Sequence, residues 1–237
     1  MREILDGLAK TVLKAPCNWL AVKRRTYLTT ATTALVASAG CLGDGGDGGT
    51  RADHPATASV EGAPVLGADP QEADSLIVAF EDPSCSICAS FHRSTLPELR
   101  ESPIGEDVAF VYRAYPIRPY AWGDPAAEAI VATADRGHDA AMSLVGHYYG
   151  NQSAFDEDNV LDRTAAFLDE ETSVDGNAVA DDVSAGAYAS VVEATVEDGE
   201  AADASTTPTF FLFDGEAFVT EITGNQDANV FRNALDR

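Results

Sequence analysis

The sequence predicts an α/β protein with a central mixed sheet and an inserted helical subdomain. Two short apolar runs, residues 76–80 and 108–112, are typical of strands buried on both faces of a sheet. A helical pattern separates them, and the order strand, helix, strand predicts a parallel crossover. Near the C-terminus, apolar runs at 209–213 and 217–222 flank Asp214-Gly215, a turn signal that predicts an antiparallel hairpin. Residues 124–202 lie between these halves and have a helical pattern throughout.

The helices are expected where apolar residues recur in three- and four-residue steps. The first should run from Cys85 to Arg100, with a kink or a break at Pro97. Within the insertion, the expected helices cover residues 126–135, 140–149, 159–168 and 179–196. A last helix, residues 227–235, should close the fold.

The charge of the chain is divided unevenly along its length. The first 41 residues carry a net charge of +4 and the remainder carries −28, within a total of −24 for 237 residues. Every basic residue after Lys23 is an arginine. So acidic a protein repels phosphates, which excludes a nucleic-acid role. The Asp, Glu and Ala richness without lysine resembles haloarchaeal proteins, since molar salt shortens the Debye length to about 3 Å and screens such a surface.

Residues 1–41 are interpreted as an export segment rather than as part of the fold. Arg24 and Arg25 precede an aromatic residue and a leucine, and a mild apolar run ends at Ser38-Ala39-Gly40-Cys41. This pattern resembles a twin-arginine signal joined to a lipobox, which implies that Cys41 is lipidated and anchors the protein to the outer face of the cell membrane. The run is about a dozen residues, short of the roughly 20 that cross a bilayer.

Residues 42–64 are predicted to form a flexible tether. This stretch is rich in Gly, Asp, Ala and Thr and poor in large apolar side chains. Such a composition buries too little surface to offset the entropy of ordering. The folded domain is therefore expected to span residues 65–237.

Two of the four cysteines lie in the predicted folded domain, and they form a CxxC motif. Cys17 falls in the export segment and Cys41 at its end, which leaves Cys85 and Cys88. At a strand-to-helix turn, the first thiol would lie at a helix N-terminus, where unpaired N–H groups favour the thiolate. The second would lie one helical turn away, close enough to attack a mixed disulfide.

The residues around this pair resemble the DsbA-like branch of the thioredoxin superfamily. The resemblance rests on the motif Phe80 to Cys88, the following helix, the inserted helices, and Thr206 to Phe210 before a strand. It implies a thioredoxin-like fold, a thiol:disulfide oxidoreductase, and a cis Pro208 beside the cysteines that acts with them in catalysis. Thr207 would offer its backbone to an extended client, beside Ser86 and Ile87. The implied partners are exported client proteins with cysteines and an unidentified redox partner, and no cofactor is implied.

The sequence departs from that family at two places. Ser86 and Ile87 carry no charge that could stabilise a thiolate, so the direction of exchange stays open between oxidation and reduction. Many relatives have a buried acid six residues before the first cysteine, where this chain has Ala79. Glu81 or Asp82 could take over its role in proton transfer, or could be solvated loop carboxylates or helix caps.

Two other functions are compatible with the sequence. His92, four residues after Cys88, could join the cysteines at a metal, which would make the chain a metal-binding chaperone, although no further ligands complete a site and no metal is expected. Alternatively, the chain could be a non-catalytic, lipid-anchored binding module with a structural disulfide.

Two further motifs lie in or next to the insertion. The aromatic residues Tyr112, Tyr115, Tyr120 and Trp122 could form a client-binding wall, but packing against the inserted helices is favoured. A glycosylation sequon, Asn151-Gln152-Ser153, lies in an expected loop and decides nothing by itself.

Overall fold

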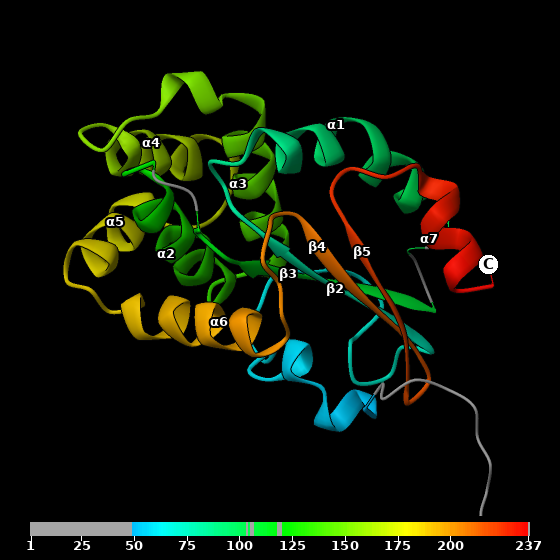
Figure 1. Cartoon of the computed structure of the whole chain (residues 1–237). Helices are drawn as coiled ribbons and strands as arrows, with labels where there is room; N and C mark the ends of the chain where they lie inside the picture. Colours follow the sequence, from blue (N-terminus) through cyan, green and yellow to red (C-terminus); the bar gives the residue numbers. More distant parts are fainter. Residues whose placement is uncertain (1–48, 103, 105–106, 118–119, 237) are drawn as a thin grey trace, which may run out of the picture. The chain divides into compact units, whose positions relative to one another are not determined.

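The computed structural model describes residues 49–102, 104, 107–117 and 120–236. The export segment, with Arg24, Arg25 and Cys41, lies outside these residues, so its predicted roles stay predictions. Figure 1 shows a central sheet with α1 across one face and helices α2 to α6 gathered beside it. In chain order the strands and α-helices are β1 (Val65–Gly67), β2 (Ser75–Glu81), α1 (Ser86–Glu101), β3 (Val108–Ala114), α2 (Gly123–Ala134), α3 (His138–Gly150), α4 (Val160–Glu171), α5 (Gly176–Ser184), α6 (Ala189–Ala201), β4 (Thr209–Asp214), β5 (Ala217–Thr223) and α7 (Ala228–Ala234).

The sheet has five strands in the order β1-β3-β2-β4-β5. Strands β2 and β3 are parallel, and every other neighbouring pair is antiparallel. This mixed arrangement confirms the predicted crossover and hairpin. Gly215 has φ +53° in the turn between β4 and β5, a conformation that glycine adopts without a steric penalty. Strand β1 is three residues long and was not predicted, because so short a segment shows no clear periodicity.

Both faces of the sheet are covered, which explains why its central strands consist mostly of apolar residues. All seven residues of β2 are buried. Ile77 and Ala79 point into a core shared with helices α1, α2 and α3, whereas Leu76, Val78 and Phe80 point into a second core on the other face. Successive side chains of a strand alternate between faces, so a strand buried on both sides carries apolar residues at consecutive positions rather than at every second one.

The N-terminal part of the described chain covers the second face, contrary to the predicted tether. Two short 3₁₀ helices, η1 (Arg51–Asp53) and η2 (Pro55–Thr57), place Ala56 in the second core with no exposed surface. The ring of His54 stacks on Phe218 at 4.7 Å between centroids. The prediction of flexibility is therefore wrong for residues 50–64. The composition of this segment was misleading, because its small residues and one histidine pack against the apolar face of the sheet.

A buried arginine also holds this segment to the sheet. The guanidinium of Arg113, which is 1% exposed, donates to the carbonyls of Ala56 and Ala58. It also forms an ion pair with Asp198 of α6 at 2.8 Å. Desolvation lowers the pKa of Arg113, and the bond from Asp198 opposes that shift. The carboxylate and the carbonyls supply the compensation that a buried cation requires.

In its described residues, the insertion between β3 and β4 contains five α-helices rather than the predicted four. The predicted helix 179–196 is interrupted, because α5 ends at Ser184 and α6 begins at Ala189. Gly186 lies in the break with φ +70°. Pro97 does not end α1, which continues to Glu101. In the described residues, no helix combines the length and the apolar character that a membrane crossing requires.

Candidate active site around Cys85 and Cys88

The CxxC motif lies where β2 gives way to α1. The last residue of β2 is Glu81, and Cys85 is the N-cap of α1 with extended φ and ψ of −77° and 122°. Hydrogen bonds within the loop between them stabilise it, since Asp82 Oδ1 accepts from the amide (2.7 Å) and the hydroxyl (2.5 Å) of Ser84. Its other oxygen accepts from the amide of Ile117 at 3.1 Å. Asp82 therefore shapes the loop and is not a solvated carboxylate.

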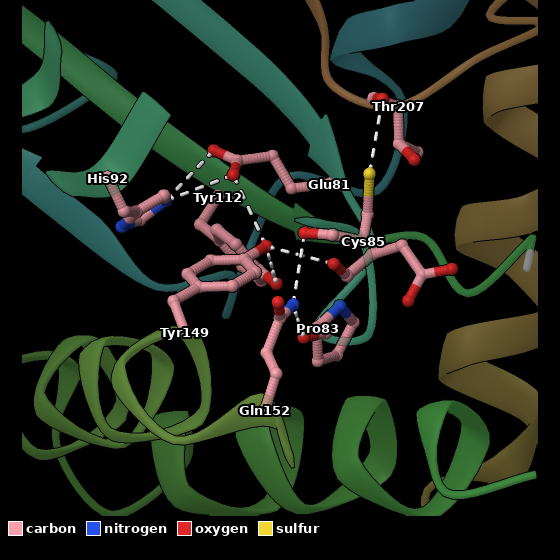
Figure 2. Close-up of polar contacts among 9 residues, drawn as sticks. Glu81, Pro83, Cys85, His92, Tyr112, Tyr149, Gln152 and Thr207 are labelled. Carbon is pink, nitrogen blue, oxygen red and sulfur yellow. Dashed lines mark hydrogen bonds and ion pairs between the residues drawn. The ribbon is translucent and has the colours of Figure 1, made fainter. Parts of the chain in front are cut away.

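The loop before β4 lies directly against the first cysteine. The thiol of Cys85 donates to the carbonyl oxygen of Thr207 at 3.4 Å, as Figure 2 shows. The Thr207-Pro208 bond is cis, as the resemblance implied. Because β2 and β4 are neighbouring strands, their ends bring residues 85 and 207 together from opposite ends of the domain.

Cys85 is almost completely buried in the folded protein. It retains 4% of its surface, because the Thr207 loop covers it, and Cys88 retains none. Ile87, between them, is 45% exposed, and Ser86 is also exposed. The first thiol therefore lies just below a surface formed by the residues between the cysteines.

The two thiols are driven toward opposite protonation states. The pKa of Cys85 falls to about 5, chiefly because the Cys88 side chain hydrogen-bonds to it, and despite the opposing effect of burial. The Thr207 side chain and the amides of Cys88 and Ile87 lower it further. The pKa of Cys88 rises well above its usual value, first through burial and then through the bond to Cys85 and the charge of Glu81. Cys85 is therefore the thiolate and Cys88 the thiol near neutral pH.

The hydroxyl of Thr207 is placed to act on that thiolate. The residue is 1% exposed, and within the described part of the chain its Oγ1 has no hydrogen-bond partner of ordinary geometry. As a donor near the sulfur of Cys85 it nevertheless contributes to the lowered pKa. A buried hydroxyl costs free energy unless it finds a partner, and ionisation of Cys85 supplies one.

Below the cysteines lies a buried polar group that the sequence only partly indicated. Glu81, with a fully buried side chain, contacts His92 Nε2 at 3.0 Å through Oε2 and at 3.2 Å through Oε1. The Tyr149 hydroxyl lies 3.2 Å from Glu81 Oε2, and 3.2 Å from the hydroxyl of Tyr112. The sequence suggested Glu81 as a replacement for the acid missing at Ala79, but it placed His92 at a hypothetical metal. In the described residues no group of three or more His, Cys, Asp or Glu side chains could hold a metal ion.

Gln152 is a site residue that sequence reasoning missed. It lies in the 3₁₀ helix η3 (Gln152–Ala154), and its Nε2 donates to the carbonyls of Pro83 (2.9 Å) and Cys85 (3.0 Å). Figure 2 shows this side chain reaching from the helical insertion to the loop of the cysteines. In the sequence, Gln152 is only the middle residue of the glycosylation sequon that begins at Asn151. No local pattern indicated its contact with the loop.

Most residues of the predicted aromatic cluster are packed in the interior, which was the favoured interpretation. Tyr112, Tyr115 and Trp122 are buried, and the Trp122 ring stacks on Phe155. Tyr120 is the exception, with 57% of its surface exposed.

The fold and this site define a thioredoxin-fold protein with a strand-to-helix CxxC motif facing a cis-proline loop. A family model described as thioredoxin matches residues 59–237, and the chain belongs to this family. A search of curated proteins found no match.

Solved structures similar to this chain support the same fold. Oxidised BdbD from Bacillus subtilis is 20% identical with a TM-score of 0.65, over 75% of this chain and 92% of that one. The thiol-disulfide exchange protein alpha-DsbA2 from Wolbachia pipientis is 17% identical with a TM-score of 0.59, over 73% and 86%. A thioredoxin-like oxidoreductase from Silicibacter pomeroyi is 23% identical with a TM-score of 0.55, over 75% and 92%.

Proposed function

We propose that this chain exchanges disulfides with client proteins, with Cys85 as the nucleophile and Cys88 as the resolving thiol. The observation that carries the proposal is the opposite shift of the two pKa values, downward to about 5 at Cys85 and upward at Cys88. A disulfide that merely stiffens a binding module has no need of one thiol held as a thiolate beside an exposed surface. Neighbours of the same fold include a protein named for thiol-disulfide exchange.

The exchange conserves electrons and protons in either direction. When the chain oxidises a client, a client thiolate attacks Cys85 and breaks its bond to Cys88, and the thiolate of Cys88 takes up a proton. A second client thiolate then attacks the client sulfur of this mixed disulfide. The client disulfide forms, and Cys85 leaves as a thiolate. Two electrons have then passed from the client to the CxxC pair. Reduction of a client disulfide follows the same steps in reverse.

We further propose that oxidation of clients is the favoured direction. A thiolate that is stabilised in the folded protein lowers the free energy of the reduced form, and so makes the disulfide form a better oxidant. The Cys88 thiol first, and then the Thr207 hydroxyl and the amides at the start of α1, supply that stabilisation without a charged residue between the cysteines.

The proposed clients are exported proteins with cysteines, and they would bind across Ser86, Ile87 and the backbone of Thr207. Pro208 would shape the loop that presents this backbone. The export segment, with Arg24 and Arg25, and a lipid on Cys41 would place the domain at the outer face of the membrane. The acidic domain would find its unidentified redox partner there.

Trapping of mixed disulfides tests the function. Cys88→Ala should accumulate covalent complexes with exported cysteine-containing proteins, because the resolving thiol is gone. The matched Cys85→Ala variant and the double variant should form none. Equal trapping by Cys85→Ala, or none by either variant with abundant client, would overturn the proposal.

A further inference from the structure

A cavity of about 630 Å³ lies between α1, α3 and β1. Each of these elements contributes one aliphatic side chain to its wall: Leu96, Met142 and Leu66. His92 also lines the cavity, and Figure 2 shows His92 on the far side of Glu81 from Cys85. A molecule bound here would therefore leave Cys85 free to react with a client.

The wall of this cavity is rich in cations, although the protein as a whole is strongly acidic. The chain has 39 acidic residues against 15 basic ones. Arg93 and Arg100 are exposed and line the cavity, whereas Asp139 is the only carboxylate in its described wall. The two arginines are seven residues apart, so they lie on the same face of α1. This local excess of positive charge favours an anionic group in the cavity.

Neither arginine is neutralised by a carboxylate of this protein. Arg93 donates to the carbonyl of Tyr149 at 3.2 Å and to the hydroxyl of Ser90 at 3.4 Å, and both acceptors are neutral. In the described residues, no carboxylate lies within ion-pair distance of either guanidinium. Arg113 and Arg136, in contrast, each form an ion pair with an aspartate. The charges at the cavity are therefore available to a ligand.

Gly146 keeps the cavity open, and the packing of the protein does not require a glycine there. It lies in the interior of α3, and a Cβ added to it would meet no atom within 4 Å. Glycine in the interior of a helix is less favourable than alanine. Gly150, one turn further along, lines the same cavity and has equally open surroundings. This side of the wall therefore leaves room for the backbone of another chain to approach α3.

The length of the cavity is that of a short extended peptide. Along α1 its wall runs from His92 to Arg100, a distance of about 12 Å at about 1.5 Å per residue. An extended chain advances about 3.3 Å per residue, so about four residues span this wall. Arg93 and Arg100 are about 10 Å apart along the helix axis, which corresponds to carboxylates about three positions apart in such a peptide.

We propose that this cavity binds an extended acidic segment of a partner protein. Two carboxylates of the segment pair with Arg93 and Arg100, and an apolar side chain between them packs on Leu96 and Met142. Charge-assisted hydrogen bonds from the guanidinium groups give the preference for acidic segments. The proposal adds a partner site to the proposed function and does not depend on it.

Titration calorimetry with a synthetic probe tests the proposal on the full chain. The probe is the capped tetrapeptide Glu-Leu-Ser-Glu, and the control is Gln-Leu-Ser-Gln, which has a similar shape and no charge. The acidic peptide should bind about 10-fold more tightly, because charge-assisted hydrogen bonds are about twice as strong as neutral ones. Equal affinities, or no binding of either peptide, would overturn the proposal.

Variants of the arginines distinguish a specific site from a general attraction between charges. The double variant Arg93→Gln and Arg100→Gln should bind the acidic peptide about 10-fold more weakly and the neutral peptide unchanged. Arg163→Gln removes the same charge from an exposed position on α4, outside the cavity wall, and should change neither affinity. An equal loss of affinity in Arg163→Gln would show that net charge alone matters, which contradicts the site.

Substitutions of Gly146 test the shape of the cavity. Gly146→Leu should fill it and abolish binding of the acidic peptide. Gly146→Ala should raise the midpoint of thermal unfolding, because alanine is the better helix former and meets no obstacle. Full binding by Gly146→Leu would rule out this cavity as the site. A lower midpoint in Gly146→Ala would contradict the inference that the glycine leaves space for an occupant.

A membrane surface is the other macromolecule that could offer anions to these arginines. The net charge of −24 opposes approach to an anionic membrane, so sedimentation with phosphatidylglycerol vesicles should be the same with and without the two arginines. Vesicle binding that depends on both arginines, without binding of the acidic peptide, would replace the partner protein by a membrane. Trapping of mixed disulfides tests the redox function separately from all these measurements.

Discussion

Cys85 and Cys88 are one helical turn apart, yet the protein treats their sulfurs in opposite ways. The upper region, comprising Cys85, Ile87 and Thr207, offers hydrogen-bond donors to a thiolate just below the surface. The lower region, comprising Cys88 and Glu81, combines complete burial with a negative charge. The comparison shows how a single turn at a helix N-terminus can span the boundary between a reactive surface and a core.

The largest expected difference between the two regions is in alkylation. At pH 7 iodoacetamide should modify Cys85 at least about 10-fold faster than Cys88, because only the first is a thiolate and the second is fully buried. The rate at Cys85 should fall to half near pH 5. Mass spectrometry of the modified peptides gives both rates. Equal rates of modification would contradict the difference between the two cysteines.

A second expected effect links the upper region to stability. The pKa of Cys85 is about 5 in the folded protein against an ordinary value of 9.0. Because the folded value is the lower one, ionisation adds stability that is fully present above pH 9 and disappears as the pH falls to about 5. The oxidised protein lacks this contribution.

The measurement is denaturant unfolding of the reduced and oxidised forms across that range. The stability of the reduced form relative to the oxidised form should rise steadily from pH 5 toward pH 9. A difference that is flat with pH would show that Cys85 is not a stabilised thiolate.

A substitution at Thr207 separates the effect of its hydroxyl on the pKa of Cys85 from the other causes of the shift. Thr207→Val removes the hydroxyl but keeps the shape and the backbone carbonyl that contacts Cys85. The pKa of Cys85 should rise while staying below 9.0, because the bond from Cys88 is the larger cause of the shift. The ultraviolet absorbance of the thiolate as a function of pH measures this, with Thr206→Val as the control. A titration unchanged by Thr207→Val would contradict the role of the hydroxyl.

The sequence was sufficient to predict what local patterns encode. Continuous apolar runs predicted β2 and β3, Asp214-Gly215 predicted the hairpin, and the CxxC motif after a strand predicted where α1 begins. The resemblance added the cis bond at Pro208. These features depend on a few neighbouring residues, so they are visible without knowledge of the tertiary structure.

The features that sequence reasoning missed depend on contacts between distant segments. Glu81 and His92 are 11 residues apart and meet because a strand and the following helix pack face to face. The sequence of residues 50–64 predicts flexibility, but in the folded protein Arg113 and the apolar face of the sheet hold this segment in place. Nothing in the immediate neighbourhood of such residues signals a partner that is supplied by another element.

Gln152 is the sharpest case of such a contact, and it should give the smallest effect. Gln152→Ala leaves the carbonyls of Pro83 and Cys85 without this donor, but Cys85 O still accepts from the amide of Ala89 at 3.0 Å. Because one partly buried hydrogen bond contributes about 1 kcal/mol, the free energy of unfolding should fall by about 1 to 2 kcal/mol. Denaturant unfolding measures the loss, with Asn151→Ala as the neighbouring control.

The same variant shows whether the helical insertion tunes the thiolate or only holds its loop. Gln152 is not among the groups that lower the pKa of Cys85, so that titration should not move in Gln152→Ala. A shift as large as that of Thr207→Val would mean that the insertion acts on the reacting sulfur through the Cys85 carbonyl. The upper region would then extend across η3, and the insertion would belong to the chemistry as well as to the scaffold.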